Sequence, residues 1–225
     1  MAPLVLLAGM NCTADLWTGC GLDDARTPIL TSASMDAQVA RLLDELPERF
    51  VLGGLSLGAI VGMALAVRAP ERLAGLILIS TNAKAPTAAQ QEGWQEWRAR
   101  LDEGATPLEL QAGIAAALLS PPAFEDAGLR ERALAMGADT PPAVLRAQLA
   151  MQSTRADLRP GLRGLTVPTL IVSGQDDGIC PPVFHREIAA AIAGSELATI
   201  PGGHLLPMEQ PAAFGQLVRT WRRGL

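Results

Sequence analysis

One serine in this chain stands where it could act as a nucleophile. Ser56 lies in the segment GLSLG at residues 54–58, which has the spacing G-x-S-x-G. The apolar run FVL at 50–52 precedes it, and apolar residues with helical spacing follow at 60–66. This order predicts a strand, a sharp turn and a helix, with the Ser56 hydroxyl exposed at the apex of the turn. Glycines are expected beside it because a larger side chain would collide with the neighbouring strand or helix.

Other interpretations of the same stretch compete with this one. Residues 50–67 carry no charge and lie between two arginines, so their length also suits a membrane-spanning helix. Four glycines and a strand-like start favour a buried strand and helix instead. A dinucleotide-binding fingerprint is excluded, because glycines at 53, 54, 58 and 62 do not give G-x-G-x-x-G. Since G-x-S-x-G also arises by chance, the motif needs catalytic partners elsewhere in the chain.

A serine hydroxyl needs a base to remove its proton, and a neutral imidazole usually does this near pH 7. The chain has two histidines, His185 and His204. His185 lies inside a predicted helix, where we expect an exposed or partly packed side chain. His204 follows a predicted strand and the sequence PGG at 201–203, in a loop that would meet the Ser56 turn at one edge of the sheet. We therefore predict that His204 is the base.

The base in turn needs a carboxylate that holds its tautomer and stabilises the imidazolium. Asp176 and Asp177 are adjacent in a predicted turn after a strand, so both cannot face one imidazole. The order serine, aspartate, histidine along the chain is the one expected with this kind of turn. An aspartate before Gly178 is also a common turn former, so the residues alone leave both candidates open.

Acyl transfer also requires N–H donors for the oxyanion that develops on the carbonyl. The backbone of Leu57, directly after the nucleophile, is expected to provide one donor. The loop after the first strand is expected to provide the other, and Met10 is the candidate there. Gly9 would let this loop approach the substrate closely.

The elements that must position these residues alternate between strands and helices. Buried strands are predicted at 4–7, 50–52, 73–80, 169–173 and 197–200, with a weaker candidate at 29–31. Helices are predicted at 35–46, after Ser56, at 181–193 and at 207–221. This alternation predicts an α/β fold, a doubly wound and mostly parallel sheet of about six strands.

A long segment without strands interrupts the alternation. Roughly four helices are predicted near 88–102, 108–120, 124–136 and 143–156, with helix starts at Thr87 and Thr106. An all-helical insertion between two parallel strands is most simply a lid over the strand ends. We therefore expect a core of residues 1–85 and 164–225 and a helical lid of residues 86–163. Trp94 and Trp97 share a helix face, and they either wall an apolar pocket or attach the lid to the sheet.

The composition suits one domain with an insertion and excludes several classes of protein. Of 225 residues, 49% are hydrophobic and 18% are charged, which excludes a disordered chain. A net charge of −5 with scattered arginines gives no basic surface for nucleic acid. Three cysteines without metal-ligand spacing predict reduced thiols in a cytoplasmic protein that binds no metal. The N-terminal sequence MAPLVLLAG has no basic region and too short an apolar run for a signal peptide.

With these residues in view, the chain resembles the α/β-hydrolase superfamily, in particular small lid-bearing members related to esterases, enol-lactonases and cofactor-free haloperoxidases. The blocks that carry the resemblance are LVLLAGM, GLSLG, APERLAGLILIST, VPTLIVSGQDD and PGGHLLPMEQP. The resemblance implies Ser56 as nucleophile, His204 as base, Met10 and Leu57 as oxyanion donors, and no cofactor. It favours Asp177 as the acid, because the family turn usually reads Gly, two residues, then the acid.

The resemblance also suggests a substrate pocket, between the lid and the strand ends, that includes Asn11, Trp17, Trp94 and Trp97. Trp17 matches an aromatic residue often seen after the oxyanion loop, and core packing is the alternative for it. The expected function is hydrolysis of a small, largely apolar carboxylic ester, lactone or thioester through an acyl-enzyme. The alternatives are a non-hydrolytic enzyme with the same residues (an acyltransferase, a lyase or a perhydrolase) and a ligand-binding protein without turnover. The oligomeric state is not indicated.

Overall fold

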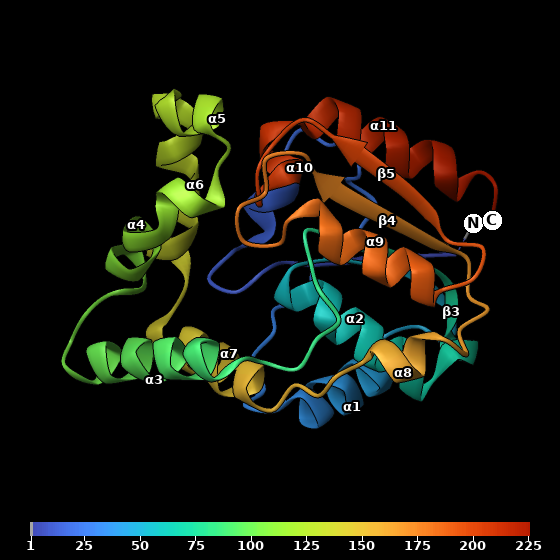
Figure 1. Cartoon of the computed structure of the whole chain (residues 1–225), viewed down its shortest axis with the longest axis horizontal. Coiled ribbons are helices and arrows are strands. Elements are labelled where there is room, and N and C mark those ends of the chain that lie inside the picture. Colours follow the sequence, from blue (N-terminus) through green and yellow to red (C-terminus); the bar gives the residue numbers. More distant parts are fainter. Residues whose placement is uncertain (1) are drawn as a thin grey trace.

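The computed structural model describes residues 2–225 and has a five-stranded sheet at its centre, in the order β1-β2-β3-β4-β5 (Figure 1). The strands are β1 (Leu4–Leu7), β2 (Phe50–Leu55), β3 (Leu73–Ile79), β4 (Thr169–Gly174) and β5 (Glu196–Ile200). Every neighbouring pair is parallel. The strands β1, β2 and β4 are buried throughout, as aliphatic runs are when helices cover both faces. The predicted α/β fold with a mostly parallel sheet is confirmed.

The weaker strand candidate at 29–31 was wrong. These residues lie in the loop between β1 and α1 (Met35–Glu45). Ile29 is 62% exposed and only Leu30 of the three is buried, so little apolar burial holds this segment in a sheet. At this edge Arg26 instead makes an isolated bridge to Val5 of β1. The sheet consequently has five strands, where the sequence predicted about six.

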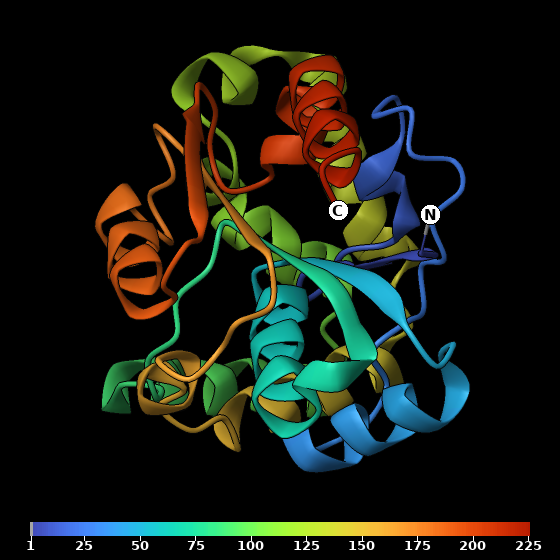
Figure 2. The same ribbon diagram turned by 90° about the vertical axis from the view of Figure 1, so that its right-hand side faces the viewer.

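Helices cover both faces of the sheet (Figure 2). In β3, Leu76 and Leu78 point to one face while Ile77 and Ile79 point to the other, as the alternation of side chains along a strand requires. The first face carries α1, α2 (Leu57–Arg68), α8 (Arg159–Leu162) and α9 (Pro182–Ala191), and the second carries the 3-10 helix η1 (Ala14–Trp17) and α11 (Pro211–Arg222). Two apolar layers therefore enclose the sheet, in the predicted doubly wound arrangement.

The stretch at 50–67 forms β2 and most of α2, joined at Ser56. A single membrane-spanning helix, the alternative interpretation of this stretch, is thus wrong. Within residues 2–225, no helix has the length and apolar character needed to cross a membrane.

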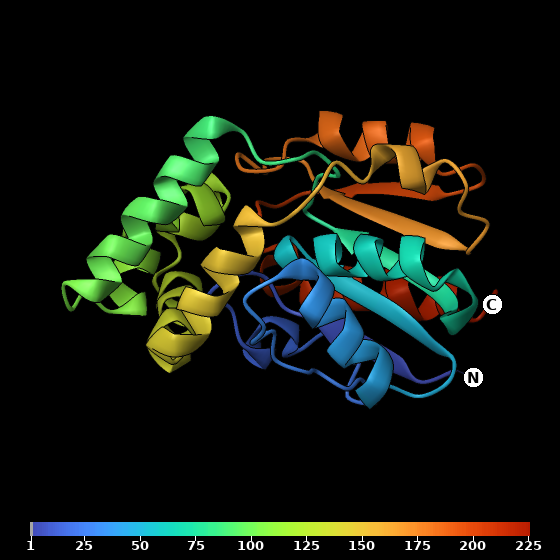
Figure 3. The ribbon, with the colours of Figure 1, turned by 90° about the horizontal axis from the view of Figure 1, so that it is seen from below.

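Between β3 and β4 the chain forms a helical insertion, which lies beyond the ends toward which the strands run (Figures 1 and 3). Its helices beyond the strand ends are α3 (Ala88–Asp102), α4 (Pro107–Leu118), α5 (Pro121–Glu125), α6 (Ala127–Asp139) and α7 (Pro142–Ser153). The short helix α8, which also precedes β4, packs on the sheet instead. Thr87 and Thr106 form the N-terminal capping boxes of α3 and α4, which confirms both predicted helix starts. The third predicted helix is divided into α5 and α6 because Asp126 caps the second of them.

The C-terminal segment after β5 is also divided where one helix was predicted. It forms α10 (Leu206–Glu209) and then α11, separated at Gln210. Pro211 follows at once, and a proline has no N–H with which to continue the hydrogen bonds of α10. A short 3-10 helix, η2 (Pro70–Arg72), joins α2 to β3. The loop with His204 lies between β5 and α10, at the edge of the sheet where Ser56 follows β2.

Candidate active site

Ser56 lies at the sharp turn between β2 and α2, with a backbone conformation of φ 52° and ψ −113°. A positive φ is uncommon for a residue with a side chain and persists only where the surroundings hold it. A Cβ added at Gly54 would lie 2.3 Å from the carbonyl carbon of Gly58, and one added at Gly58 would lie 2.2 Å from the carbonyl oxygen of Leu7. Both predicted requirements for glycine are confirmed, and they explain how the turn is held.

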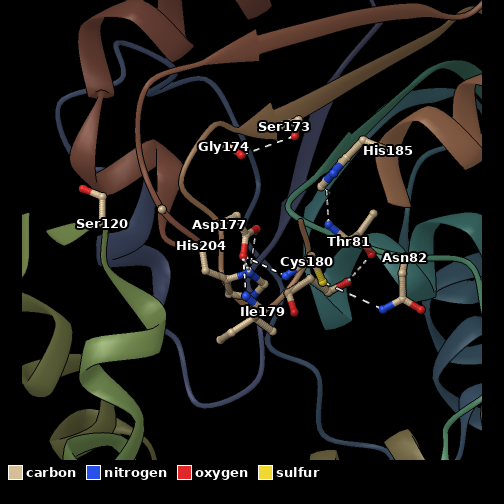
Figure 4. Close-up of polar contacts among 12 residues, drawn as sticks. Thr81, Asn82, Ser120, Ser173, Gly174, Asp177, Ile179, Cys180, His185 and His204 are labelled. Atoms are coloured by element: carbon tan, nitrogen blue, oxygen red, sulfur yellow. Dashed lines mark hydrogen bonds and ion pairs between the residues drawn. The ribbon is translucent and has the colours of Figure 1, made fainter. Parts of the chain in front are cut away.

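His204 and Asp177 meet at the same edge of the sheet (Figure 4). The Nδ1 atom of His204 lies 3.1 Å from Oδ1 and 3.0 Å from Oδ2 of Asp177. Both residues are buried, with 3% of each exposed. Asp176 is exposed and turns away, although its N–H donates to the carbonyl of Gly202. The structure therefore brings Asp177, and not Asp176, to the imidazole.

The carboxylate of Asp177 is held ionised by its partners. Its Oδ1 accepts hydrogen bonds from the N–H groups of Ile179 at 2.9 Å and Cys180 at 2.8 Å. Burial acts to raise the pKa of Asp177, but the charge and hydrogen bond of His204 and the two backbone N–H groups outweigh it and lower the pKa below its ordinary value. An ionised carboxylate at Nδ1 keeps the ring proton on that nitrogen, which leaves Nε2 free to accept a proton.

A cavity of about 280 Å³ joins the candidate residues. Ser56, His204 and Met10 line it together with Trp94 and Trp97 of the helical insertion. Within residues 2–225, the side-chain hydrogen bonds of His204 go to Asp177 and not to Ser56 Oγ. A bond between nucleophile and base is often long in an unliganded site and shortens when substrate binds. The insertion and the sheet thus share one cavity.

The two predicted oxyanion donors come from the start of α2 and from the loop after β1. Leu57 begins α2, and the first N–H groups of a helix have no partner within it. In the other loop, the N–H of Asn11 donates to Gln148 and that of Cys12 donates to the carbonyl of Gly9. Met10 and Gly9 both line the cavity, and among the hydrogen bonds of residues 2–225 neither N–H has a partner, which is compatible with the predicted role of Met10.

Two predicted pocket residues do not line the cavity. Asn11 is 1% exposed, and its Nδ2 donates to the Pro107 carbonyl and to Gln111 Oε1 at 2.9 Å each. It therefore ties the oxyanion loop to α4. Trp17 packs on Phe214 in the core, with ring centres 6.1 Å apart, because η1 turns it toward α11. Core packing, the alternative for Trp17, is what the structure contains.

Several polar residues of the cavity wall were not predicted from the sequence. They are Asn82, Gln90, Gln152 and Arg155. None of them belongs to a short motif, since they come from the end of β3, from α3 and from the end of α7. Only the fold, which places those three segments around Ser56, would have indicated them.

His185 is fully buried, so the expectation of an exposed or partly packed side chain was wrong. Its Nε2 accepts a hydrogen bond from the N–H of Thr81 at 3.0 Å (Figure 4). The hydroxyl of Thr81 in turn donates to the carbonyl of Ser56 at 3.2 Å. His185 thus supports the backbone behind the nucleophile and does not face the cavity as a base.

The burial of His185 makes the stability of the fold sensitive to acid. Burial lowers the pKa of this ring from 6.5 to about 4 in the folded protein. Between these values the unfolded chain binds more protons than the folded one, so the free energy of unfolding decreases as the pH falls from 6.5 to 4. The loss is about 3 kcal/mol from this group. Urea unfolding at pH 7 and pH 4 measures it.

The control for this effect is His185→Gln, whose amide oxygen can still accept from Thr81. The variant is expected to be less stable than the native protein at pH 7, because the fit is imperfect, but to lose about 3 kcal/mol less between pH 7 and pH 4. If both proteins lost the same free energy of unfolding between pH 7 and pH 4, His185 would not be neutral in the folded protein.

Glu209 of α10 joins the His204 loop to the helical insertion. Its two carboxylate oxygens accept from the N–H of Gly203, at 3.1 and 3.0 Å. The same carboxylate accepts from the N–H of Ser120 at 3.1 Å and from its hydroxyl at 2.6 Å. The residue before His204 is therefore fixed by a single side chain that also holds the turn after α4.

Glu209→Ala is expected to lower kcat/KM of the hydrolysis proposed below by about 10- to 100-fold, because small displacements of a catalytic group are costly. Steady-state kinetics with a p-nitrophenyl ester measures the effect. Glu196→Ala, which removes an exposed carboxylate from β5, serves as the control and should stay within about twofold. Unchanged kinetics in Glu209→Ala would show that the loop keeps its position without this carboxylate.

Known proteins resemble the chain over most of its length. The sequence profile of the Alpha/beta hydrolase family matches residues 11–217. The chain is 29% identical over 189 residues to 3-oxoadipate enol-lactonase 2 of Acinetobacter baylyi, and the matched region covers 83% of the chain and 68% of that protein. It is 30% identical over 174 residues to a pimeloyl-[acyl-carrier protein] methyl ester esterase of Aliivibrio salmonicida, and the matched region covers 74% of the chain and 65% of that protein. The chain thus spans about two thirds of the length of these two relatives.

A solved structure extends the resemblance to three dimensions. A thermophilic esterase from Thermogutta terrifontis, determined with malate bound, superposes with a TM-score of 0.89 at 30% sequence identity. The superposition covers 100% of this chain and 90% of that one.

Proposed function

This chain belongs to the alpha/beta hydrolase family, and from that premise we propose that it is a serine hydrolase of small carboxylic esters, lactones or thioesters. The observation that carries the proposal is the Asp177–His204 pair, whose imidazole lines the same cavity as Ser56. The comparisons support a hydrolase, since the similar proteins include an enol-lactonase and esterases. Ser56 as nucleophile, His204 as base and Asp177 as acid are the roles in this proposal.

In the proposed reaction, Ser56 Oγ attacks the substrate carbonyl carbon while His204 Nε2 takes the hydroxyl proton. The carbonyl oxygen becomes an oxyanion and accepts hydrogen bonds from the N–H groups of Met10 and Leu57. The bond to the leaving alcohol or thiol then breaks, and His204 gives that group the proton. An acyl group remains on Ser56.

The second half of the reaction releases the acid. A water molecule attacks the acyl carbon while His204 takes one of its protons. The bond to Ser56 Oγ breaks, and the proton on His204 returns to that oxygen. Asp177 stays ionised throughout, which stabilises the imidazolium in both halves.

The helical insertion at 86–163 has the role of a lid in this proposal. It provides Trp94 and Trp97 to the cavity that Ser56 and His204 line, so its position limits the access of water and substrate. The three cysteines, Cys12, Cys20 and Cys180, are free thiols, and with them we propose a cytoplasmic enzyme.

The experiment that tests the proposal is intact-protein mass spectrometry after incubation with a fluorophosphonate. The native protein is expected to gain one adduct, and Ser56→Ala is expected to gain none. Hydrolysis of p-nitrophenyl esters, lactones and acyl thioesters is then compared between the two proteins. An adduct on Ser56→Ala, or no adduct on the folded native protein, contradicts the proposal.

A further inference from the structure

Arg155 is a buried cation in the wall of the cavity that Ser56 and His204 also line. It follows α7 by two residues, and only 6% of its surface is exposed. Its Nη1 donates to Gln152 Oε1 at 3.1 Å, and its Nη2 donates to Gln90 Oε1 at 3.0 Å. Side chains from α7 and α3 therefore hold the guanidinium in place.

No carboxylate neutralises this charge in the part of the chain that the structure describes. Among residues 2–225, the ion pairs within 4.0 Å all involve other side chains. The two glutamine bonds use two of the five N–H donors of Arg155, and its Nε is buried without a partner. A buried charge without a counter-ion is costly, so an anion bound here would be stabilised.

Trp94 adds to the definition of this position. Its ring centre lies 5.3 Å from Arg155 Cζ, within the range of a cation–π contact. Burial lowers the pKa of Arg155 from its ordinary value, yet an arginine keeps its charge in proteins. The stacking orients the guanidinium but supplies no negative charge.

Apart from Arg155 and the imidazole of His204, the cavity wall consists of neutral groups. Among the described residues that line it, Arg155 is the only Lys, Arg, Asp or Glu. Amide and hydroxyl groups lie on part of the wall, and apolar groups on the remainder, including Ile60, Trp97, Ile114 and Leu118. A molecule that matches this wall has an apolar body and one negative group.

We propose that Arg155 binds a free carboxylate of the substrate, so that the enzyme acts on small esters, lactones or thioesters that carry an ionised carboxyl group apart from the scissile carbonyl. A planar guanidinium matches a carboxylate in both charge and geometry. The inference rests on the proposed function, because Ser56 must act on the molecule that Arg155 holds. The cavity of about 280 Å³ suits a compact substrate, such as the half-ester of a dicarboxylic acid of about four to six carbons.

The first test measures binding to the Ser56→Ala protein, which does not consume an ester. Calorimetry compares monomethyl glutarate with methyl 4-carbamoylbutanoate, in which an uncharged amide replaces the carboxylate. Monomethyl glutarate is expected to bind about 10- to 100-fold more tightly. Adding Arg155→Met is expected to abolish this preference. Adding Arg98→Met, which removes an exposed arginine of α3, is the matched control and should preserve it.

The second test measures kinetics of the protein with Ser56 in place. It compares the p-nitrophenyl monoester of glutaric acid with p-nitrophenyl pentanoate. Arg155→Met is expected to lower kcat/KM for the anionic ester by about 10- to 100-fold, mainly through KM, and to change that for pentanoate by less than about threefold. An arginine that only holds α3 against α7 would affect both esters alike.

The outcomes separate this inference from the proposed hydrolysis. Equal affinities for the acid and the amide in the Ser56→Ala protein overturn the inference, and this result does not require a folded Arg155 variant. A preference that survives Arg155→Met overturns it as well. A carboxylate preference that depends on Arg155, without hydrolysis of any ester, supports the anion site and contradicts the hydrolase. Hydrolysis without a preference for the anionic ester supports the hydrolase and contradicts the anion site.

Discussion

Ser56→Ala is expected to lower kcat by about 10⁴- to 10⁶-fold while the protein remains folded. The hydroxyl oxygen is the atom that bonds to the acyl carbon in the proposed reaction, and alanine has no such atom. Alanine fits the site, because the methyl group only omits the oxygen that faces the cavity. Burst and steady-state kinetics with a p-nitrophenyl ester measure the change, and thermal unfolding verifies the fold.

A matched control for this variant is Ser173→Ala in β4. Its hydroxyl is buried, and among the described residues its hydrogen bond goes to the neighbouring Gly174 carbonyl, at 3.4 Å (Figure 4). We expect kcat within about threefold of the native value, since the contact is local. Comparable activity in the Ser56 and Ser173 variants would remove Ser56 from the mechanism.

Asp177→Asn is expected to lower kcat by about 10⁴-fold. The N–H groups of Ile179 and Cys180 both donate to Oδ1, so the amide oxygen of an asparagine must occupy that position. Its NH₂ group then faces His204 Nδ1, which lies 3.0 Å from Oδ2 in the native protein. The imidazole would have to accept at Nδ1 and carry its proton on Nε2, where it cannot act as a base.

Asp176→Asn is the control, because it makes the same chemical change one residue earlier. Its side chain is exposed, so we expect kcat and the melting temperature to stay near the native values. The same assay and thermal unfolding serve for both variants. A larger loss in Asp176→Asn than in Asp177→Asn would transfer the role of the acid to Asp176.

Much of the fold follows from local sequence signals. The uncharged stretch at 50–67 predicted a strand, a turn and a helix, because it has a strand-like start, four glycines and then apolar residues with helical spacing. The buried strands could be predicted from their aliphatic runs, and two insertion helices from the capping residues Thr87 and Thr106. The candidate at 29–31 failed because three residues give too short a pattern to indicate burial.

The candidate site was less predictable where it depends on contacts between distant segments. Gln90 and Arg155 are 65 residues apart in the chain, and no periodicity relates them. Asn11 was expected in the pocket, but Gln111, 100 residues away, binds its side chain and turns it aside. The choice between Asp176 and Asp177 likewise depends on which carboxylate meets two N–H groups after the turn. The direction in which each of these side chains points is set by tertiary packing.

The positive φ of Ser56 sets stability against activity at this one position. A conformation of this kind costs a residue with a side chain about 1–3 kcal/mol, and glycine largely avoids the cost. The fold would therefore be more stable with glycine in place of the residue that the proposed reaction requires. Selection for thermal stability alone would favour glycine at this position, and with it the loss of the proposed nucleophile. For the same reason, libraries of this protein ranked by melting temperature will be enriched in inactive variants at residue 56.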